Sequence, residues 1–274
     1  MIENISNMKF LRYPGGKRKL LDFLDNYLPE KDKIEGKYIE PFVGGGSVYF
    51  HLKPKCSLIS DLNTELIELY RGIKNYPKKV WDIFKVFPTG KKNYYLIRGE
   101  EIKSRPIYYR AARTLYLNRT CFKGMWRHNS EGMFNVGYGG EARRWVITYE
   151  NILEVSKALK NTKIINSDFA NIISQSKNGD FLFLDPPYKP GEREMFHAHY
   201  THGKFTFDEQ IRLAKLLKKI SKEKNIKWIM TNSSNKEICK LYSRNFDILK
   251  IPKGTSEIVG VFKKSGNEVL IKNF

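Results

Sequence analysis

A carboxylate, two prolines and a tyrosine follow directly after an apolar run in the second half of the chain. The run Phe181–Leu184 is typical of a buried β-strand. Four residues end it: Asp185, Pro186, Pro187 and Tyr188. Consecutive prolines cannot continue a β-ladder, because neither has a backbone N–H and both have a fixed φ. We therefore expect the carboxylate and the ring to be held rigidly at the carboxyl edge of a sheet, where open α/β sheets bind ligands.

These four residues suit chemistry on a planar amine, and we predict them as the catalytic residues. The exocyclic amine of adenine is a weak nucleophile because its lone pair is delocalised into the ring. A carboxylate and a proline carbonyl can accept its two N–H bonds, which favours a pyramidal nitrogen whose lone pair points at a methyl donor. Tyr188 can stack on the base, which must leave a duplex to reach such a site.

A glycine-rich turn earlier in the chain indicates a nucleoside site. The turn Gly44–Gly46 follows a short strand that ends near Glu40, and a second strand, Ser57–Ser60, ends in Asp61. An acid at this distance from the glycines is expected to bind ribose hydroxyls. The glycines do not follow the Gly-x-Gly-x-x-Gly spacing, and S-adenosylmethionine, a nucleoside without a pyrophosphate, would explain that difference. The alternative is a turn that only connects strand to helix.

Two other motifs border the same expected edge. Asp168 follows the expected strand Thr162–Ile165 and is suited to bind an adenine amino group. Pro14–Lys17, before an expected helix, resembles a phosphate-binding loop. However, Arg18 stands where that motif has Ser or Thr, so we do not expect a P-loop NTPase.

Composition favours a globular protein that binds a polyanion. The chain has 274 residues, with 49 Lys and Arg against 29 Asp and Glu, which leaves a net charge of +20. Nucleic acid is the leading partner for such an excess, and a merely basic soluble protein is the alternative. The three cysteines are few and widely spaced. No apolar run is long enough to span a bilayer, and the sequence has no signal-peptide pattern. We therefore expect a cytoplasmic protein that is associated with the nucleoid through DNA and does not bind membranes.

The order of expected elements predicts an α/β fold with an insertion. Residues 62 to about 118 are expected to be mainly helical and interrupt the alternation of strands and helices. In residues 119–140, glycines, aromatic residues and basic residues alternate. We predict that this segment is a hairpin whose exposed tip binds nucleic acid, and a glycine-rich packing loop is the alternative.

The last part of the chain carries a polar loop and the closing strands. The loop, residues 189–204, contains His197, His199 and His202, but no spacing of carboxylates or cysteines supports a metal site. We expect a mobile lid and no metal. Residues 258–262 and 268–271 are expected to be strands that close the sheet together as a hairpin.

In motif order the chain resembles the DNA adenine methylase (Dam) family, the alpha group of S-adenosylmethionine-dependent adenine-N6 DNA methyltransferases with an Asp-Pro-Pro-Tyr motif. The resemblance covers nearly the whole chain. It implies a Rossmann-like seven-stranded methyltransferase sheet with an inserted, mainly helical DNA-recognition domain that bears a β-hairpin. The catalytic domain would comprise residues 1–70 and 148–274, and the target-recognition domain residues 71–147.

The resemblance also implies roles for individual residues. S-adenosylmethionine would be bound by Tyr13, Lys17, Glu40, Phe42, Gly44, Asp61, Asp168, Phe169 and Asp185. Within this set, Asp61 would take the ribose, and Asp168 with Phe169 would hold the adenine. Double-stranded DNA would be contacted by Arg12, Arg119, Phe122, Lys123, Met125, Arg127, Asn129 and Gly137. Arg127 and Arg12 match positions that read guanines in the family.

Departures from the family bear on the recognised sequence. Lys123, Met125 and Gly137 replace the Asn, Leu and Pro usual in members that methylate GATC, so another short site that contains adenine is favoured. The resemblance implies a site-specific adenine DNA methyltransferase, with a cognate restriction endonuclease as a candidate partner. The alternatives are an amino-cytosine (N4) methyltransferase, disfavoured by Asp185 and Tyr188, and a non-catalytic DNA-binding relic of the fold.

Overall fold

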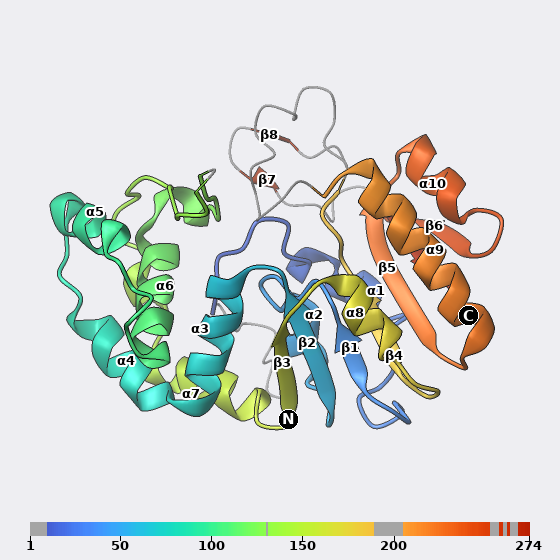
Figure 1. Ribbon diagram of the computed structural model, residues 1–274, viewed down its shortest axis with the longest axis horizontal. Coiled ribbons are helices and arrows are strands. Elements are labelled where there is room, and N and C mark those ends of the chain that lie inside the picture. Colours follow the sequence, from blue (N-terminus) through green and yellow to red (C-terminus); the bar gives the residue numbers. More distant parts are fainter. Residues whose placement is uncertain (1–9, 130, 189–204, 253–257, 260–261, 264–267) are drawn as a thin grey trace.

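The protein is built around a mixed seven-stranded sheet (Figure 1). The computed structural model describes residues 10–129, 131–188, 205–252, 258–259, 262–263 and 268–274. The strands of the sheet are β1 (Tyr38–Glu40), β2 (Ser57–Asp61), β3 (Thr162–Asn166), β4 (Phe181–Leu184), β5 (Lys227–Ser233), β6 (Asp247–Lys250) and β9 (Glu268–Lys272). Their order is β3-β2-β1-β4-β5-β9-β6, and β9 runs antiparallel to both of its neighbours. The predicted fold class is confirmed.

The strand order reverses between β1 and β4, and this reversal positions the site. The chain continues from β1 to β2 on one side, whereas β4 and β5 lie on the other. Ile39 of β1 pairs with Leu58 of β2 and with Leu182 of β4. All residues of β1, β2 and β4 are buried, as expected for central parallel strands covered on both faces. Ligands of open α/β sheets bind in the crevice at such a switch point.

Helices cover both faces of the sheet (Figure 1). On one face are η2 (Arg18–Leu20), α1 (Leu21–Leu24), α2 (Ser47–Leu52), α3 (Thr64–Asn75) and α7 (Tyr149–Ala158). On the other face are α8 (Phe169–Ser174), α9 (Phe207–Glu223) and α10 (Lys236–Tyr242). Along β4, Phe181 and Phe183 belong to the first core and Leu182 and Leu184 to the second, because successive side chains of a strand point to opposite faces.

The segment expected to be inserted packs against α3. It comprises α4 (Pro77–Val86), α5 (Lys91–Gly99), α6 (Ile107–Thr120), η3 (Phe122–Gly124) and η4 (Arg144–Val146). All ten residues from 111 to 120 of α6 are buried, so this helix is the centre of the segment. Tyr38 of β1 and Tyr116 of α6 belong to the same continuous hydrophobic core. The expected boundary between residues 70 and 71 falls inside α3, and the division into two domains stays a prediction.

The expected recognition hairpin is a paired loop rather than a regular two-stranded ladder. Its two sides meet in two isolated antiparallel bridges, Cys121 with Tyr138 and His128 with Phe134. The ladder is interrupted because Lys123 and Gly124 have left-handed backbone conformations, with φ of 52° and 67°. Trp126, Phe134 and Val136 are buried in the core, so part of the alternative, a packing loop, also holds.

The expected hairpin at the end of the chain is wrong. Glu268–Lys272 forms β9, which lies between β5 and β6 and pairs with both. Both edges of β9 are therefore used, and β7 (Ile258–Val259) instead pairs with β8 (Phe262–Lys263) in a separate two-stranded sheet. The expected lid, residues 189–204 with its three histidines, lies outside the described residues. Within the described part of the chain, no helix combines the length and the apolar character that a bilayer crossing requires.

Gly72 allows the closest contact between α3 and α6. A Cβ at this position would lie 2.4 Å from Cβ of Ala111. Alanine is intrinsically favoured over glycine inside a helix, so the contact decides the effect of a substitution. We expect Gly72→Ala to lower the free energy of unfolding by about 1–3 kcal/mol in urea denaturation, because overpacking forces the helices apart.

Gly99 is the matched control for this substitution. It is a helical glycine at the last position of α5, and a Cβ there would meet no atom within 4 Å. Gly99→Ala should leave the unfolding free energy unchanged within about 0.5 kcal/mol or raise it. Equal stability of both variants would contradict the close packing of α3 on α6.

Candidate active site and DNA interface

Asp185 lies at the end of β4 and is held by two side chains. Nζ of Lys17 forms an ion pair with Oδ1 of Asp185 at 2.9 Å. The hydroxyl of Thr231 donates a hydrogen bond to the same oxygen at 2.7 Å. The Asp185 side chain is 22% exposed, so it is accessible from one side only. The predicted catalytic carboxylate is therefore fixed in direction before any ligand binds.

Lys17 is placed beside Asp185 and Tyr188. Only 5% of the residue is exposed, and Nζ also donates to the carbonyl of Gly15 at 3.0 Å and lies 4.7 Å from the centre of the Tyr188 ring. Burial alone would lower the pKa of Lys17, but the interactions with Asp185, Tyr188 and Glu268 together more than offset this effect, and the pKa is raised above its ordinary value. The ammonium is therefore retained. Burial raises the pKa of Tyr188 as well, so its phenol stays neutral.

The two prolines are held from the opposite side of the sheet. The side-chain amide of Gln210, in the first turn of α9, donates to the carbonyl of Pro187 at 2.9 Å. Gln210 in turn accepts a hydrogen bond from Asn232 of β5 at 3.1 Å, and both side chains are fully buried. Sequence reasoning missed Gln210, Thr231 and Asn232. A signal was present, since polar residues in a strand core and on the inner face of a helix need partners.

The glycine turn after β1 is closed by Asp61. Oδ2 of Asp61 accepts the backbone N–H of Gly44 at 3.0 Å, and Oδ1 accepts that of Asn63 at 2.9 Å. Burial raises the pKa of Asp61, against the lowering effect of these backbone donors. Each carboxylate oxygen has a second lone pair, so hydroxyl groups of a ligand can still bind. Asp61 thus lies where the sequence places it, at the end of β2.

The glycines of this turn accommodate a ring of the chain itself. A Cβ at Gly44 would lie 2.9 Å from Cε1 of Tyr13, and a Cβ at Gly45 would lie 2.8 Å from its Cβ. Gly44 also has a φ of 46°, which side chains rarely adopt. Tyr13 packs in addition on Trp126, with 5.6 Å between ring centres. It therefore joins the glycine turn to the recognition loop.

Glu40 is a second buried acid at this edge. It is 2% exposed and accepts a hydrogen bond from the hydroxyl of Tyr38 at 2.6 Å. Burial raises the pKa of Glu40 well above its usual range; the Tyr38 hydrogen bond opposes this shift, whereas the neighbouring charges of Asp185 and Asp61 add to it. The raised pKa favours the neutral form of Glu40, which lies close enough to Asp61 and Asp185 to respond to their charges.

Asp168 and Phe169 lie at the end of β3, next to an aromatic cluster. Asp168 caps α8 through a hydrogen bond from the N–H of Ala170 at 2.9 Å, and its other oxygen pairs with Arg212 at 2.6 Å. Arg212 lies 4.3 Å from the centre of the Phe169 ring, which packs on Phe42 at 5.3 Å. A ligand amine that binds Asp168 must therefore share this carboxylate with Arg212, which the sequence did not indicate.

Arg12 is tied to the recognition segment through its backbone. The buried amide of Asn118, in α6, accepts from the N–H of Arg12 at 3.0 Å and donates to its carbonyl at 2.7 Å. The Arg12 side chain runs along Gly124, where a Cβ would lie 2.4 Å from that of Arg12. The structure therefore brings Arg12 together with the loop that carries Arg127, although they are far apart in sequence.

Arg127 is oriented from across the recognition loop. Its Nε donates to Oδ1 of Asn135 at 2.8 Å, and an Nη donates to the carbonyl of Asn135 at 3.2 Å. Asn129 stabilises the tip, since its Oδ1 accepts the N–H groups of Glu131 and Met133. The side chains of Asn129 and Arg127 are partly exposed.

Phe122 and Lys123 project from the start of this loop. Both are exposed, and Nζ of Lys123 lies 5.2 Å from the centre of the Phe122 ring. Met125 is partly exposed, and the carbonyl of Gly137 accepts the N–H of Phe122 at 2.8 Å. An exposed ring next to a cation suits insertion between bases with a phosphate contact.

Arg119 differs from the expectation that it contacts DNA. It is 2% exposed and donates through Nε to the carbonyl of Arg143 at 2.8 Å. Burial, together with the nearby charges of Arg12 and Arg143, lowers the pKa of Arg119 to about 10. Its position in the fully buried part of α6 explains the difference, and Arg119 contributes positive potential beneath Arg12 rather than an exposed side chain.

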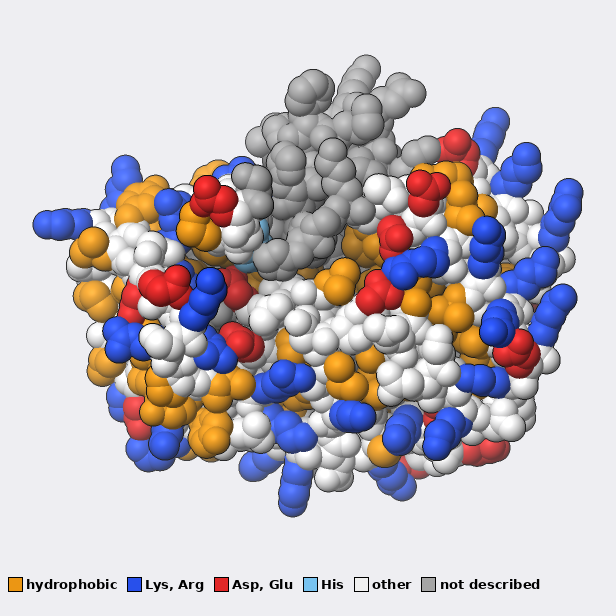
Figure 2. All heavy atoms as spheres, viewed as in Figure 1, with side chains coloured by type: hydrophobic (Ala, Val, Ile, Leu, Met, Phe, Trp, Pro, Cys, Tyr) orange, Lys and Arg blue, Asp and Glu red, His pale blue; other side chains and the backbone are white. Residues whose placement is uncertain are grey.

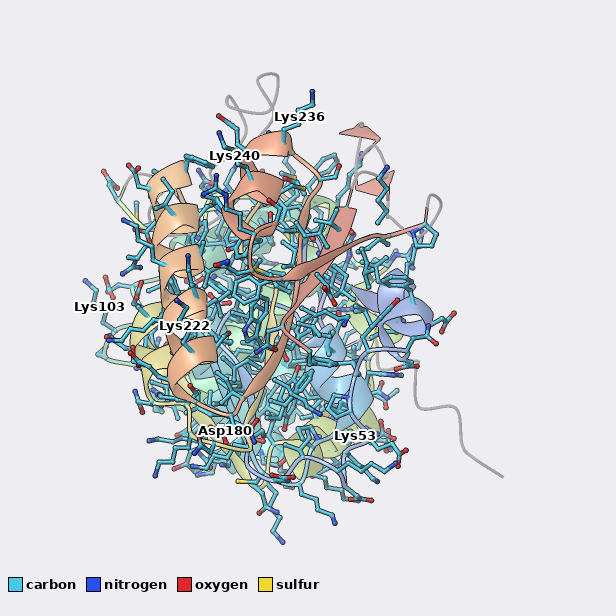
Figure 3. All side chains as sticks on the ribbon, turned by 90° about the vertical axis from the view of Figure 1, so that its right-hand side faces the viewer. Lys53, Lys103, Asp180, Lys222, Lys236 and Lys240 are labelled. Carbon is cyan, nitrogen blue, oxygen red and sulfur yellow. The ribbon has the colours of Figure 1, made fainter. Side chains whose placement is uncertain are left out.

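Positive charge is also spread over surfaces remote from the loop. Figure 2 shows Lys and Arg side chains along α9 and the lower edge of the molecule. Figure 3 shows Lys222 on α9 and Lys236 and Lys240 on α10, pointing outward.

The described residues hold no group of three or more His, Cys, Asp or Glu that could bind a metal ion.

Comparison with known proteins agrees with this arrangement. The family model of the D12 class N6 adenine-specific DNA methyltransferases matches residues 13–256. The chain belongs to this family. Adenine-specific DNA methylation is therefore the enzyme class, as predicted, and the family favours adenine over the amino-cytosine alternative and an enzyme over a non-catalytic relic.

Relatives match over most of their own length. Type II methyltransferase M.MjaIII of Methanocaldococcus jannaschii is 35% identical over 286 residues, covering 97% of this chain and 98% of the relative. Type II methyltransferase M1.LlaDCHI of Lactococcus lactis subsp. cremoris is 34% identical over 250 residues, covering 88% and 86%. The DNA adenine methylase of Escherichia coli is 28% identical over 264 residues, covering 94% and 92%.

The Asn118 amide gives a testable link between the recognition segment and the amino-terminal motif. Replacing it by leucine keeps the approximate size but leaves the N–H and carbonyl of Arg12 without this partner. We expect Asn118→Leu to lower the free energy of unfolding by about 2 kcal/mol or more, measured in urea.

Asn93→Leu is the control, because Asn93 in α5 is only partly buried and its side-chain hydrogen bond, to the carbonyl of Thr89, is exposed to solvent. That variant should change stability by less than about 0.5 kcal/mol. The anchoring role of Asn118 would be refuted if the two variants lost the same amount.

Proposed function

We propose that this adenine-specific DNA methyltransferase moves the methyl group of S-adenosylmethionine to the N6 amine of an adenine that is flipped out of a short recognition sequence in duplex DNA. The observation that carries the proposal is the fixed Asp185 carboxylate at the end of β4, directly followed by two prolines and the Tyr188 ring. Family membership supports the reaction class, and the geometry supports the roles of individual residues.

Asp185 and a proline carbonyl are proposed to bind the target amine. An N–H of adenine N6 donates to the carboxylate, and the other donates to the carbonyl of Pro186. Tyr188 stacks on the base, with the Lys17 ammonium on its ring at 4.7 Å. This geometry removes the need to orient the amine during the reaction, which is a large part of the barrier. The cost of flipping is a few kcal/mol, and stacking inside the site offsets part of it.

The cofactor is proposed to bind between the ends of β1, β2 and β3. Burial is the main cause of the raised pKa of Glu40, and the charges of Asp185 and Asp61 add to it; this local negative charge suits a cofactor that carries a positive sulfonium and ammonium. Asp61 takes the ribose hydroxyls, and Phe42 with Phe169 forms an apolar wall for an adenine ring, near Asp168. Lys17 and Gly44 border the site from the other side. Bound there, S-adenosylmethionine supplies an electrophilic methyl group.

The reaction needs no nucleophile from the protein. The N6 lone pair forms the new N–C bond as the S–C bond breaks, and the electron pair of that bond stays on sulfur. The nitrogen is then positively charged and releases one proton to water. Asp185 accepts the hydrogen bond that this positive charge strengthens, so its stabilising effect is largest in the transition state.

DNA recognition is proposed to rest on Arg12 and Arg127, with Phe122, Lys123, Met125, Asn129 and Gly137 beside them. Asn118 holds the backbone of Arg12, and Asn135 orients the guanidinium of Arg127; an oriented guanidinium can bind O6 and N7 of a guanine. The residues that differ from the GATC-methylating pattern favour another short site. Two relatives at 34% and 35% identity are named type II methyltransferases, which supports a cognate restriction endonuclease as partner.

Sequencing of single DNA molecules from cells that express the protein would identify the modified base and its sequence context together. A modified adenine in one short motif is expected. Modification of cytosine, or no modification by a folded protein, would contradict the proposal.

Asp185→Ala should reduce methyl transfer from labelled cofactor to duplex DNA by about 10²-fold to 10³-fold or more, because the main acceptor for the amine is lost. Binding of DNA should be largely kept, since the recognition loop is unchanged. Asp180→Ala is the control: Asp180 is a buried acid at the amino end of β4 that accepts the N–H groups of Lys37 and Lys177. Its loss should cost stability but not the rate per folded molecule.

Arg127→Ala should reduce discrimination at one base pair of the recognition sequence by about 1–3 kcal/mol, measured as rates on a set of DNA duplexes that differ at single positions. Lys123→Ala is the comparison, because a phosphate contact should weaken binding to all of these duplexes alike and reduce the salt dependence. An unchanged order of preference in the Arg127 variant would show that another residue reads the sequence.

A further inference from the structure

Two consecutive residues of β5 lie on either side of the catalytic turn. The parallel register pairs Leu184 of β4 with Met230 of β5, so Asp185 and Thr231 come next on neighbouring strands. Thr231 and the following Asn232 are both fully buried. Because successive residues of a strand point to opposite faces, one of them reaches the face covered by α3 and the other the face covered by α9.

Thr231 acts on the carboxylate. Its hydroxyl donates to Oδ1 of Asp185 at 2.7 Å, and the Lys17 ammonium lies 2.9 Å from the same oxygen. Two donors on one oxygen define the plane and rotation of the carboxylate. They also use Oδ1, which leaves Oδ2 to accept the N–H of the target amine. A donor from neutral Thr231 stays in place whatever the charge around Lys17.

Asn232 acts on the prolines through one intermediate. Its amide donates to Gln210, and Gln210 donates to the carbonyl of Pro187. The carbonyl of Pro187 is thereby directed towards α9, on the face opposite to Lys17. The carbonyl of Pro186 is the one that remains for the target amine. Asp185 is thus held by Thr231 of β5, and the carbonyl of Pro187 is held through Gln210 by Asn232 of the same strand.

We propose that Thr231 and Gln210 are positioning residues for methyl transfer: Thr231 sets which oxygen of Asp185 faces the target amine, and Gln210 sets which proline carbonyl does. This proposal rests on the proposed function. Neither residue contacts the substrate, so each acts on the chemical step through Asp185 or Pro187. Removing either should lower the rate constant for transfer without an equal loss of cofactor or DNA binding.

The test for Thr231 uses isosteric variants. Thr231→Val keeps the shape but removes the donor, whereas Thr231→Ser keeps the donor. We expect Thr231→Val to reduce the single-turnover rate constant about tenfold to 100-fold, the range for a hydrogen bond to a charged group, and Thr231→Ser to restore most of it. The KM for S-adenosylmethionine and the Kd for duplex DNA should each change less than about threefold.

Thr162→Val provides the matched control. Thr162 is a buried strand threonine at the amino end of β3, where its hydroxyl contacts Tyr49 and Ser57. Its loss should lower the melting temperature as a buried hydroxyl does, with the rate constant unchanged. Gln210→Met is an independent second variant, similar in size and without the donor, for which we expect about a tenfold lower rate constant with binding kept.

The outcomes separate this proposal from the function on which it rests. If the wild-type protein transfers no methyl group, the proposed function fails. If it does, a Thr231→Val protein that is folded and fully active overturns the role of Thr231. Loss of cofactor binding in proportion to rate, or failure of Thr231→Ser to recover activity, would make Thr231 a structural residue and also overturn it. Full activity of Gln210→Met would overturn the role of Gln210.

Discussion

The ion pair between Lys17 and Asp185 is the interaction on which the site depends. Both groups are taken largely out of water, which costs several kcal/mol for each charge unless they are paired and hydrogen-bonded. Lys17 also donates a hydrogen bond to the Gly15 carbonyl, and Asp185 accepts one from the Thr231 hydroxyl, so each charge has a further hydrogen bond. The ion pair also joins the amino-terminal segment to β4.

The same amino-terminal segment connects the catalytic edge to the recognition loop. Within a few residues, Arg12 is held by Asn118 of α6, Tyr13 packs between the glycine turn and Trp126, and Lys17 pairs with Asp185. A movement of the recognition loop on DNA would therefore shift residues that contact the glycine turn and Asp185, because one short stretch of chain carries all of these contacts. Chains of packed and hydrogen-bonded groups of this kind are one physical means by which two sites can be coupled.

The sequence predicted the sheet and its acids because their signals are local. Apolar runs that end in Asp61, Asp168 or Asp185 identify strand ends without knowledge of the fold, and parallel strands bring these ends to one edge. The partners Thr231, Gln210 and Arg212 could not be found in this way, since each belongs to the site only through the strand register or the packing of α9. Arg119 was expected to contact DNA from the family resemblance, but it lies in the part of α6 in which every residue is buried. Pairing of β9 with β6 likewise depends on which sheet edge is free, which a sequence pattern does not contain.

The protein has a net charge of +20, but three of its acids lie together at the edge of the sheet where we propose that a cation binds. Positive potential attracts DNA to the whole surface, whereas the proposed function requires a carboxylate that accepts the target amine and a site for a cationic cofactor next to it. Asp61 and Asp185 place negative charge at the switch point, next to the buried Glu40, whose pKa is raised mainly by burial and further by these two charges. Lys17 neutralises one of these charges without filling the site, since its ammonium occupies Oδ1 of Asp185 alone. The separation of a basic exterior from acids at the switch point is thus what the proposed function requires, since it combines binding of a polyanion with binding of a cation.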